Sequence, residues 1–337
     1  MPNVMLTDYC NQNCSYCFAK KMMDEGKGNI STGNFKRAID FIVKSGEKKI
    51  GLIGGEPTLH PDFLELLGYV LGKVKTTLLF TNGIIEKNIT KKLGDVDDEG
   101  FSVLLNLNGK STYSYRQLEL VKHTLKCLGK KISLGYNIHT TEFDLNFHLE
   151  MIMKYGLSKE LRLGLASPIA GKGVKDFFQP SDDTRVGKTL IKNAEMLEEN
   201  DVLLALDCGF YMCMFTVEQL GILTEKTTGF QSICNPILDI DLDLNVHRCF
   251  PMTGVAMKKL VDFKDTESVR NDFLERFEAL KILGNEGRCL TCKYMKRKQC
   301  RGWCLGRIIN SNEGVLEKIQ ANERKKTEQM TLAERHR

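Results

Sequence analysis

The stretch Cys10-Asn11-Gln12-Asn13-Cys14-Ser15-Tyr16-Cys17 lies near the start of the 337-residue chain and directs the interpretation of the rest. Its three cysteines are so closely spaced that their thiolates can surround one face of an iron–sulfur cubane and bind three of its irons. The fourth iron then has no protein ligand and is open to a small molecule. Structural zinc normally takes four ligands, and no histidine lies nearby to complete such a set.

A second motif, Gly54-Gly55-Glu56-Pro57, closes a strand predicted over residues 49–53. In a parallel barrel the functional site is built where the strands end, so this turn and the cysteine loop are expected to meet. Its glycines would let the backbone approach a ligand closely, because they carry no side chain. Taken alone, the motif is better explained as a tight loop, and its place beside the cysteines is what favours a functional role.

Strand and helix patterns alternate through the first part of the chain. Apolar, β-rich runs predict strands over residues 4–7, 49–53, 76–81, 101–107, 132–138, 161–165 and 202–206, with helix-period segments between them. Repeated β–α units imply a parallel sheet whose faces are covered by helices. The units are too few for a closed eight-stranded barrel. The predicted fold class is therefore α/β, an open, partial (β/α)6 TIM-like barrel.

Three regions are expected: the barrel over residues 1–206, a cysteine-rich domain over 207–310 and a charged tail over 311–337. In the second region residues 237–246 are expected to form a strand or hairpin, and residues 268–283 a helix capped by Ser268. The remainder is irregular, as in a fold organised around metal rather than a large apolar core.

The composition, 42% hydrophobic and 27% charged, fits a soluble globular protein. No apolar run is long enough to span a membrane and no secretory signal is present, so the protein is expected to be cytoplasmic. A reducing compartment gives the twelve cysteines no disulfide role. Eleven of them fall into two zones, residues 10–17 and 208–304, which argues for metal binding. Cys127, between the zones, is expected to be a buried thiol on its helix.

The second zone holds eight potential thiolate ligands, enough for two complete four-cysteine clusters. They are Cys208, Cys213, Cys234, Cys249, Cys289, Cys292, Cys300 and Cys304. Zinc is the alternative that spacing alone does not exclude. Residues 288–337 carry 13 Lys and Arg against 5 Glu, and these cations interleave with cysteines, where they would offset the negative charge of a cluster. Nucleic-acid binding is the weaker explanation of this charge.

The first zone resembles the radical SAM enzymes, whose hallmark is a Cys-x3-Cys-x-aromatic-Cys loop followed by a Gly-Gly-Glu-Pro turn. The resemblance implies that Cys10, Cys14 and Cys17 hold a [4Fe–4S] cluster whose open iron binds S-adenosylmethionine. Tyr16 would lie near the adenine, and Gly54, Gly55 and Glu56, followed by Pro57, would contact the methionyl amine. One electron from the cluster would split the sulfonium, and the resulting 5′-deoxyadenosyl radical would abstract a hydrogen atom from the substrate.

Polar residues at other strand ends are further candidates for contacts with the cofactor or the substrate. The third strand ends at Thr81-Asn82-Gly83, as in this family. The others are Asn106 and Asn108, which could reach the ribose, and Asn137, Arg162 and Ser167. Each of these is equally well explained as an ordinary strand-end or turn residue.

The second zone resembles the SPASM extension of radical SAM enzymes, which holds two auxiliary [4Fe–4S] clusters, or the shorter twitch extension, which holds one. The resemblance assigns Cys234, Cys249 and Cys304 to the first cluster and Cys289, Cys292 and Cys300 to the second. The sequence departs from the pattern: the middle gap has seven residues instead of five, Leu244-Asn245 replaces a glycine, and no cysteine follows Cys304.

Two roles are open for Cys208 and Cys213. One of them fills the vacant ligand place, unless the second cluster keeps an open iron for substrate; ligation is the favoured role because eight thiolates make two complete sets. Alternatively, one of them faces the radical and donates a hydrogen atom to a substrate radical, which would complete an epimerisation.

The leading functional hypothesis is a radical SAM oxidoreductase that modifies a ribosomally made peptide or protein by oxidation, cross-linking or epimerisation. It predicts a peptide substrate, an electron donor such as flavodoxin or ferredoxin, and, since only nine residues precede Cys10, a separate peptide-recognition protein or direct binding at the barrel mouth. One alternative is a radical SAM dehydrogenase of a small metabolite. Another is a non-catalytic protein that binds zinc or nucleic acid.

Overall fold

A parallel sheet forms the centre of the computed structural model, which describes residues 1–170, 183–230, 233–255, 257–283, 288–312 and 314–321. From β1 to β8, each strand pairs in parallel with the one that follows it in the chain. The strands are β1 (Asn3–Met5), β2 (Lys49–Ile53), β3 (Thr76–Thr81), β4 (Phe101–Asn106), β5 (Ile132–Ile138), β6 (Glu160–Leu165), β7 (Leu203–Leu206) and β8 (Thr227–Phe230). The seven strands predicted from the sequence are confirmed as β1 to β7.

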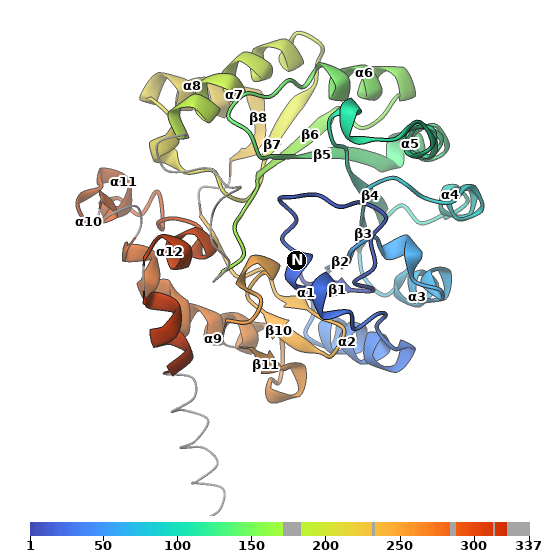
Figure 1. Cartoon of the computed structure of the whole chain (residues 1–337), viewed down its shortest axis with the longest axis horizontal. Coiled ribbons are helices and arrows are strands. Elements are labelled where there is room, and N and C mark those ends of the chain that lie inside the picture. The colour runs from blue at the N-terminus through green and yellow to red at the C-terminus, as the bar shows by residue number, and fades with distance from the viewer. Residues whose placement is uncertain (171–182, 231–232, 256, 284–287, 313, 322–337) are drawn as a thin grey trace, which may run out of the picture.

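The sheet curves into an open barrel, as predicted (Figure 1). It stays open because β1 does not pair with β8. On that side β1 instead pairs in parallel with β9 (Asp239–Ile240), and β10 (Asn245–His247) and β11 (Lys258–Lys259) continue the sheet in antiparallel fashion. The cysteine-rich region therefore contributes its own strands to the barrel sheet. The strand β8 was not predicted, because Thr227–Phe230 has no run of buried apolar residues.

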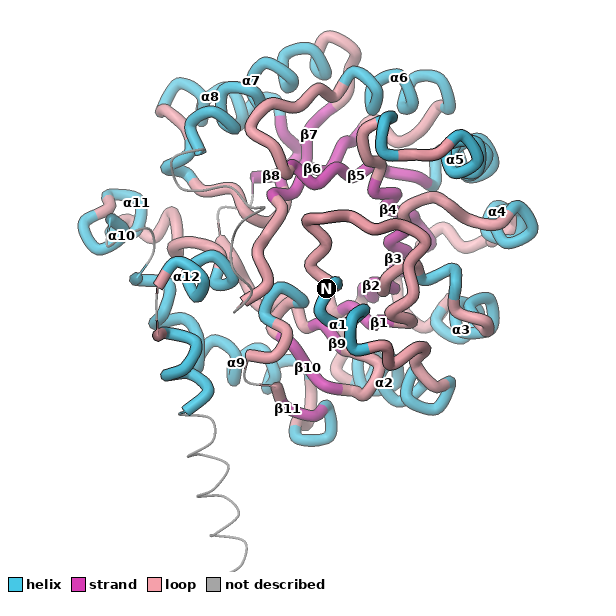
Figure 2. The backbone as a smooth tube through the Cα atoms, viewed as in Figure 1, coloured by secondary structure: helices cyan, strands magenta, loops and turns pink. Residues whose placement is uncertain are grey.

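Helices cover the outer face of the barrel sheet (Figure 2). They are α2 (Thr32–Lys44), α3 (Phe63–Val70), α4 (Lys87–Gly94), α5 (Tyr115–Leu128), α6 (Asn146–Tyr155), α7 (Asp183–Glu198) and α8 (Val217–Lys226). In α2 the apolar residues Phe35, Ile39 and Ile42 recur at helical spacing and are fully buried. The helices thus bury one stripe each against the sheet and leave the inner face of the barrel for the site.

The C-terminal region contributes α9 (Thr266–Phe277), α10 (Arg288–Thr291), α11 (Lys293–Lys296) and α12 (Leu305–Ser311), and the short α1 (Lys20–Glu25) follows the first cysteine loop. The helix predicted over residues 268–283 begins earlier. Its cap is Asp265, whose carboxylate accepts from the backbone N–H of Ser268, so the prediction of Ser268 as the cap was wrong. Ser268 instead occupies the third helical position of a reciprocal capping box.

Residues 322–337 of the predicted tail lie outside the described residues. Among the helices that the structure describes, none has the length and apolar character required to cross a membrane. The boundary placed after residue 206 stays a prediction, although β8 joins the sheet beyond it.

Candidate active site

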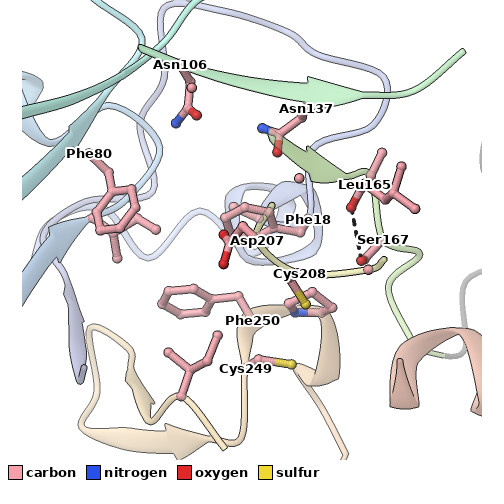
Figure 3. A pocket seen from close by; sticks show the side chains of 18 of the residues that line it. Phe18, Phe80, Asn106, Asn137, Leu165, Ser167, Asp207, Cys208, Cys249 and Phe250 are labelled. Carbon is pink, nitrogen blue, oxygen red and sulfur yellow. Dashed lines mark hydrogen bonds between the residues drawn. The ribbon is translucent and has the colours of Figure 1, made fainter. Parts of the chain in front are cut away.

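A cavity of about 520 Å³ opens where the barrel strands end. It is lined from both cysteine zones, which are far apart in the sequence. In Figure 3, Asn106 and Asn137 point into it from β4 and β5, and Cys208 and Cys249 lie across from them. The predicted site residues that line it are Cys10, Cys14, Tyr16, Cys17, Gly54, Gly55, Asn82, Asn106, Asn108, Asn137, Arg162, Ser167, Cys208, Cys234, Cys249 and Cys304.

The glycines of the second motif hold the cysteine loop against the end of β2. The backbone N–H of Gly55 donates to the carbonyl oxygen of Thr7 at 2.8 Å, and that of Glu56 donates to Tyr9 at 2.7 Å. A Cβ atom at Gly55 would stand 2.2 Å from the Tyr9 carbonyl oxygen, and one at Gly54 would stand 2.6 Å from that of Thr7. The close approach that these glycines allow is therefore with the loop leading to Cys10.

Two asparagine side chains contact the sulfur atoms of the first zone. The amide nitrogen of Asn82 lies 3.7 Å from Cys10 Sγ, and that of Asn108 lies 3.6 Å from Cys14 Sγ. Asn82 also donates to the side chain of Asn11 at 2.7 Å, which ties the end of β3 to the loop. Hydrogen bonds to cluster sulfurs are one of the means by which a protein sets the reduction potential of a cluster.

A stacked pair of rings, Tyr16 and His139, lies beside the cysteine loop. The ring of Tyr16 stacks on that of His139 with centroids 4.3 Å apart. Its hydroxyl donates to the side-chain oxygen of Asn108, so the ring orientation is fixed from two sides. A planar group entering the cavity can stack on or beside such a ring.

Glu56 does not line the cavity. Its carboxylate is fully buried and accepts hydrogen bonds from the Asn82 backbone at 2.8 Å, from the Thr81 hydroxyl at 2.9 Å and from both the hydroxyl and the backbone of Thr58. Burial raises the pKa of Glu56, although these four donors oppose the shift. Pro57 is buried in the same turn. Glu56 thus joins the end of β2 to the end of β3, a role the sequence did not indicate.

Burial acts on the thiols of the first zone as well. It raises the pKa of Cys17 to about 11, and it also raises the pKa of Cys10. Metals bind the thiolate form, so cluster assembly must displace these protons.

Four cysteines of the second zone converge on the opposite side of the cavity. Cys208 lies two residues after the end of β7, Cys234 and Cys249 flank the hairpin of β9 and β10, and Cys304 precedes α12. Burial first, and then the negative charges of Cys234 and Cys304, raise the pKa of the Cys208 thiol. Burial also raises the pKa of Cys249, and the charges of Cys304 and Cys234 add to that effect.

Two buried cationic side chains lie beside these four cysteines. The guanidinium of Arg248, only 2% exposed, donates to Cys234 Sγ at 3.2 Å and to the Cys234 carbonyl oxygen at 2.8 Å. The ammonium of Lys281, 1% exposed, donates to the same carbonyl at 2.6 Å. Lys281 also pairs with Glu278 at 2.9 Å, so a negatively charged group held by these four thiolates has chiefly the charge of Arg248 beside it.

A second group consists of Cys289, Cys292 and Cys300. The backbone of Cys292 donates to the Cys289 carbonyl, and burial, then the charges of Cys289 and Cys292, raise the pKa of Cys300. Gly302, at φ +86°, donates its N–H to Cys300 Sγ at 3.4 Å. A Cβ atom there would stand 2.5 Å from the Lys281 carbonyl oxygen, so only glycine fits this turn.

Within the part of the chain that the structure describes, no three Cys, His, Asp or Glu side chains converge closely enough to hold one metal ion. A cubane distributes its ligands over four irons, so its thiolates lie further apart than those around a single ion. A compact tetrahedral zinc site needs four ligands on one atom.

Two cysteines lie away from the cavity. Cys213 is exposed on the short turn that follows Cys208 in the chain and does not line the cavity. Cys127 is exposed on α5, so the prediction of a buried thiol was wrong; its side of the helix faces outward, beside His123.

A charged pair inside the barrel was not predicted from the sequence. Arg162, on β6, donates to Asp207 at the end of β7 over 2.6 Å, and both side chains are about one-third exposed to the cavity. The aromatic residues Phe18, Phe80 and Phe250 line it as well (Figure 3). The position of Asp207 next to Cys208 was the only signal available in the sequence.

Comparison with known proteins finds a matching family model for the first part of the chain. Residues 4–127 match the model of the radical SAM superfamily, and this segment contains the cysteine loop, the Gly-Gly-Glu-Pro turn and β1 to β4. The segment 4–127 is thus similar to the radical SAM superfamily. The family uses a [4Fe–4S] cluster together with S-adenosylmethionine, and the second zone of cysteines provides for one or two auxiliary clusters.

Two relatives differ in how much of the chain they match. The AdoMet-dependent heme synthase of Methanosarcina barkeri (strain Fusaro / DSM 804) is 24% identical over 333 residues, which cover 93% of each chain. The antilisterial bacteriocin subtilosin biosynthesis protein AlbA, from Bacillus subtilis (strain 168), is 32% identical over 88 residues, which are 26% of this chain and 19% of AlbA.

Two solved structures share the fold. One is anSMEcpe with bound AdoMet and Cp18Cys peptide, at a TM-score of 0.65 and 19% identity, covering 94% of this chain and 92% of that one. The other is Streptococcus suis SuiB bound to precursor peptide SuiA, at a TM-score of 0.63 and 16% identity, covering 92% and 72%. The predicted open, partial α/β barrel followed by a cysteine-rich region is thus confirmed as a fold.

Proposed function

We propose that this radical SAM protein modifies a peptide, by abstracting a hydrogen atom from one residue of a chain that enters the cavity. The observation that carries the proposal is that both cysteine zones line the same cavity. A substrate there would lie between the site of radical formation and a group able to take up an electron. Oxidation or cross-linking of a peptide requires both.

The first zone is the proposed radical centre. Cys10, Cys14 and Cys17 hold the catalytic cluster, which supplies the electron that splits S-adenosylmethionine into methionine and a 5′-deoxyadenosyl radical. Tyr16 offers a ring for the adenine. The backbone at Gly54 and Gly55, and the amides of Asn82, Asn106, Asn108 and Asn137, offer neutral hydrogen-bond partners for the rest of the cofactor.

We assign Cys208, Cys234, Cys249 and Cys304 to one auxiliary cluster, and Cys289, Cys292 and Cys300 to a second that keeps one iron without a cysteine ligand. The proximity of Cys208 to the other three thiols favours ligation over hydrogen-atom donation. Cys213 is assigned neither role, because it lies outside the cavity.

The inner wall of the cavity suits a peptide. It combines amides, aromatic rings and the Arg162–Asp207 pair, so it can pair backbone groups and still admit an apolar side chain. Both structural neighbours described above have been solved with a peptide bound, and AlbA takes part in the biosynthesis of a bacteriocin. These likenesses support a peptide substrate. A separate recognition protein belongs to the proposal as a partner.

Oxidation of a small metabolite is the second candidate. It is favoured by one observation, the likeness to AdoMet-dependent heme synthase over 93% of both chains. The two candidates share the radical chemistry and differ in the substrate.

Substrate trials on the anaerobically reconstituted enzyme separate them. The enzyme is incubated with S-adenosylmethionine, dithionite and either short peptides encoded by neighbouring genes or metabolites of the neighbouring pathway, including porphyrins. The proposal expects a peptide that loses two hydrogen atoms, or gains one deuterium from heavy water, in step with 5′-deoxyadenosine release. Consumption of a metabolite with every peptide unchanged would contradict it.

A further inference from the structure

The surface around the second cysteine group carries an uncompensated positive charge. Lys293, Lys296, Arg297, Lys298 and Arg301 are all exposed. In the described part of the chain none of the five forms an ion pair with an acidic side chain, whereas Lys27, Lys36 and Lys122 each do. From Gly287 to Asn312 the sequence has no Asp or Glu at all.

This charge is not needed to balance the cysteines. Arg248 and Lys281 are buried beside the first group, where Arg248 donates to Cys234 Sγ and Lys281 donates to the Cys234 carbonyl oxygen. Cations in solvent are screened by salt and act weakly on a buried group. The five exposed cations therefore act outward, on the field that an approaching molecule meets.

The patch has the composition of a transient docking surface. Leu290, on α10, is 59% exposed, and Tyr294 and Met295 on α11 are half-buried around it. An apolar centre with a charged rim is the usual arrangement of a protein interface, and the interfaces of electron-transfer partners are small. Cys292 lies at the start of α11 and is only partly buried, so the second cysteine group comes close to this surface.

The position of the patch excludes a direct role at the cavity. None of the five cations lines it. Figure 1 places α10 and α11 at the periphery of the molecule, on the side opposite α4 and α5. A substrate held in the cavity would not reach the patch unless it were long, whereas an electron needs only a chain of clusters to cross the distance.

We propose that the α10–α11 surface docks a small acidic one-electron carrier protein, of the flavodoxin or ferredoxin class, and that its electron enters the chain at the second cysteine group. The proposal rests on the proposed function in one respect: each cleavage of S-adenosylmethionine consumes one electron. The carrier is oxidised by one electron, the clusters of the chain are reduced by one, and no proton or group is transferred.

The test compares two reductants on two charge-reversal variants. The docking variant carries Lys293→Glu, Lys296→Glu and Arg297→Glu. Lys298 and Arg301 are left unchanged, so that the docking variant and its control each carry three substitutions. The matched control carries Lys87→Glu, Lys91→Glu and Lys92→Glu on α4, where all three lysines are exposed. Both variants change the net charge equally. The readout is the initial rate of 5′-deoxyadenosine formation with dithionite or with a reduced recombinant bacterial flavodoxin or ferredoxin.

With dithionite we expect the parent and both variants to react at similar rates. With a reduced carrier at low salt, the docking variant should be slower than the parent by about tenfold or more, since steering by charge contributes that much to association. The α4 control should match the parent. Added salt should slow the parent and have little effect on the docking variant.

Three results would overturn the proposal. In the first, the docking variant reacts with a reduced carrier as fast as the parent does. In the second, neither flavodoxin nor ferredoxin reduces a parent that dithionite does reduce. In the third, the docking variant is slowed with dithionite as much as with a carrier, which would mean that these residues serve the fold, the cluster or an acidic substrate. A parent that releases no 5′-deoxyadenosine with dithionite would instead contradict the proposed function.

Discussion

The two cysteine zones are built in opposite ways. In the first, three thiols lie within eight residues, and a single loop is held in place by the backbone of Gly55 and Glu56. In the second, the thiols of one group come from Cys208 after β7, from both sides of the β9–β10 hairpin and from the start of α12. The first zone is a local motif, and the second exists only once the barrel and the C-terminal region have packed together. Sites built from the same kind of ligand thus differ greatly in what they require of the fold.

The largest effect on stability and iron content is expected at Gly55, which holds the loop of Cys10, Cys14 and Cys17 in place. Gly55→Ala forces a Cβ atom to within 2.2 Å of the Tyr9 carbonyl oxygen, so either the loop or the turn must move. We expect a loss of stability of about 3 kcal/mol or more, and loss of the catalytic cluster. Urea unfolding and iron analysis of the anaerobically purified variant measure both.

Gly68→Ala on α3 is the control, since a Cβ atom there meets open space. It should keep its iron and unfold at or slightly above the parent's urea concentration. A Gly55→Ala protein that retains all its iron would show that the local loop does not depend on the close approach.

A large effect is also expected at Cys208, the cysteine of the second zone that follows barrel strand β7. Cys208→Ala should lower the iron content by up to about four atoms per chain, since each cubane carries four. The 5′-deoxyadenosine yield with dithionite should persist, because the first zone is untouched. Iron, sulfide and electron paramagnetic resonance spectra of the reduced protein are the measurements.

Cys127→Ala and Cys213→Ala are the matched controls, since both thiols are exposed and outside the cavity. They should retain the parent's iron. If Cys208→Ala also retains its iron but releases 5′-deoxyadenosine without completing turnover, Cys208 is a hydrogen donor and the ligand assignment fails.

A moderate effect is expected at Glu56, which joins the ends of β2 and β3. Glu56→Gln places an amide opposite four donors, so at least one buried donor loses its acceptor. We expect a loss of about 1–3 kcal/mol in urea unfolding. Glu119→Gln, which breaks only an exposed pair with Lys122, should cost less than about 1 kcal/mol. Equal effects at the two positions would mean that Glu56 does not hold the strand ends together.

The smallest effect is expected at the amides that contact sulfur. Asn108→Ala removes a donor 3.6 Å from Cys14 Sγ, and a lost hydrogen bond to a reduced cluster lowers its reduction potential. A bond worth about 1 kcal/mol corresponds to a shift of about 40 mV for one electron. Asn106→Ala is the control, because Asn106 lines the same cavity without a bond to sulfur among the described residues. Redox titration that finds equal potentials would remove the tuning role of Asn108.

The sequence predicts those parts of the molecule that are determined by short-range patterns. Apolar runs predicted β1 to β7, and the spacing of Cys10, Cys14 and Cys17 predicted the candidate cluster loop. What it missed depends on contacts between distant segments. Two of the donors to Glu56, from Thr81 and Asn82, lie at the end of the next strand, and the Arg162–Asp207 pair joins β6 to β7. The strand β8 escaped prediction because Thr227–Phe230 is short and has a single apolar residue, Phe230. The convergence of Cys208 with Cys234 and Cys304 follows from the fold, not from spacing.

The central claim, that Cys10, Cys14 and Cys17 hold the catalytic cluster, is tested most directly by removing all three thiols. The parent and a Cys10→Ala, Cys14→Ala, Cys17→Ala variant are reconstituted without oxygen, analysed for iron and incubated with dithionite and S-adenosylmethionine. We predict that the variant lacks about four irons per chain that the parent holds, keeps the remainder, and releases no 5′-deoxyadenosine while the parent does. A variant with the parent's iron content and the parent's 5′-deoxyadenosine yield would contradict the central claim.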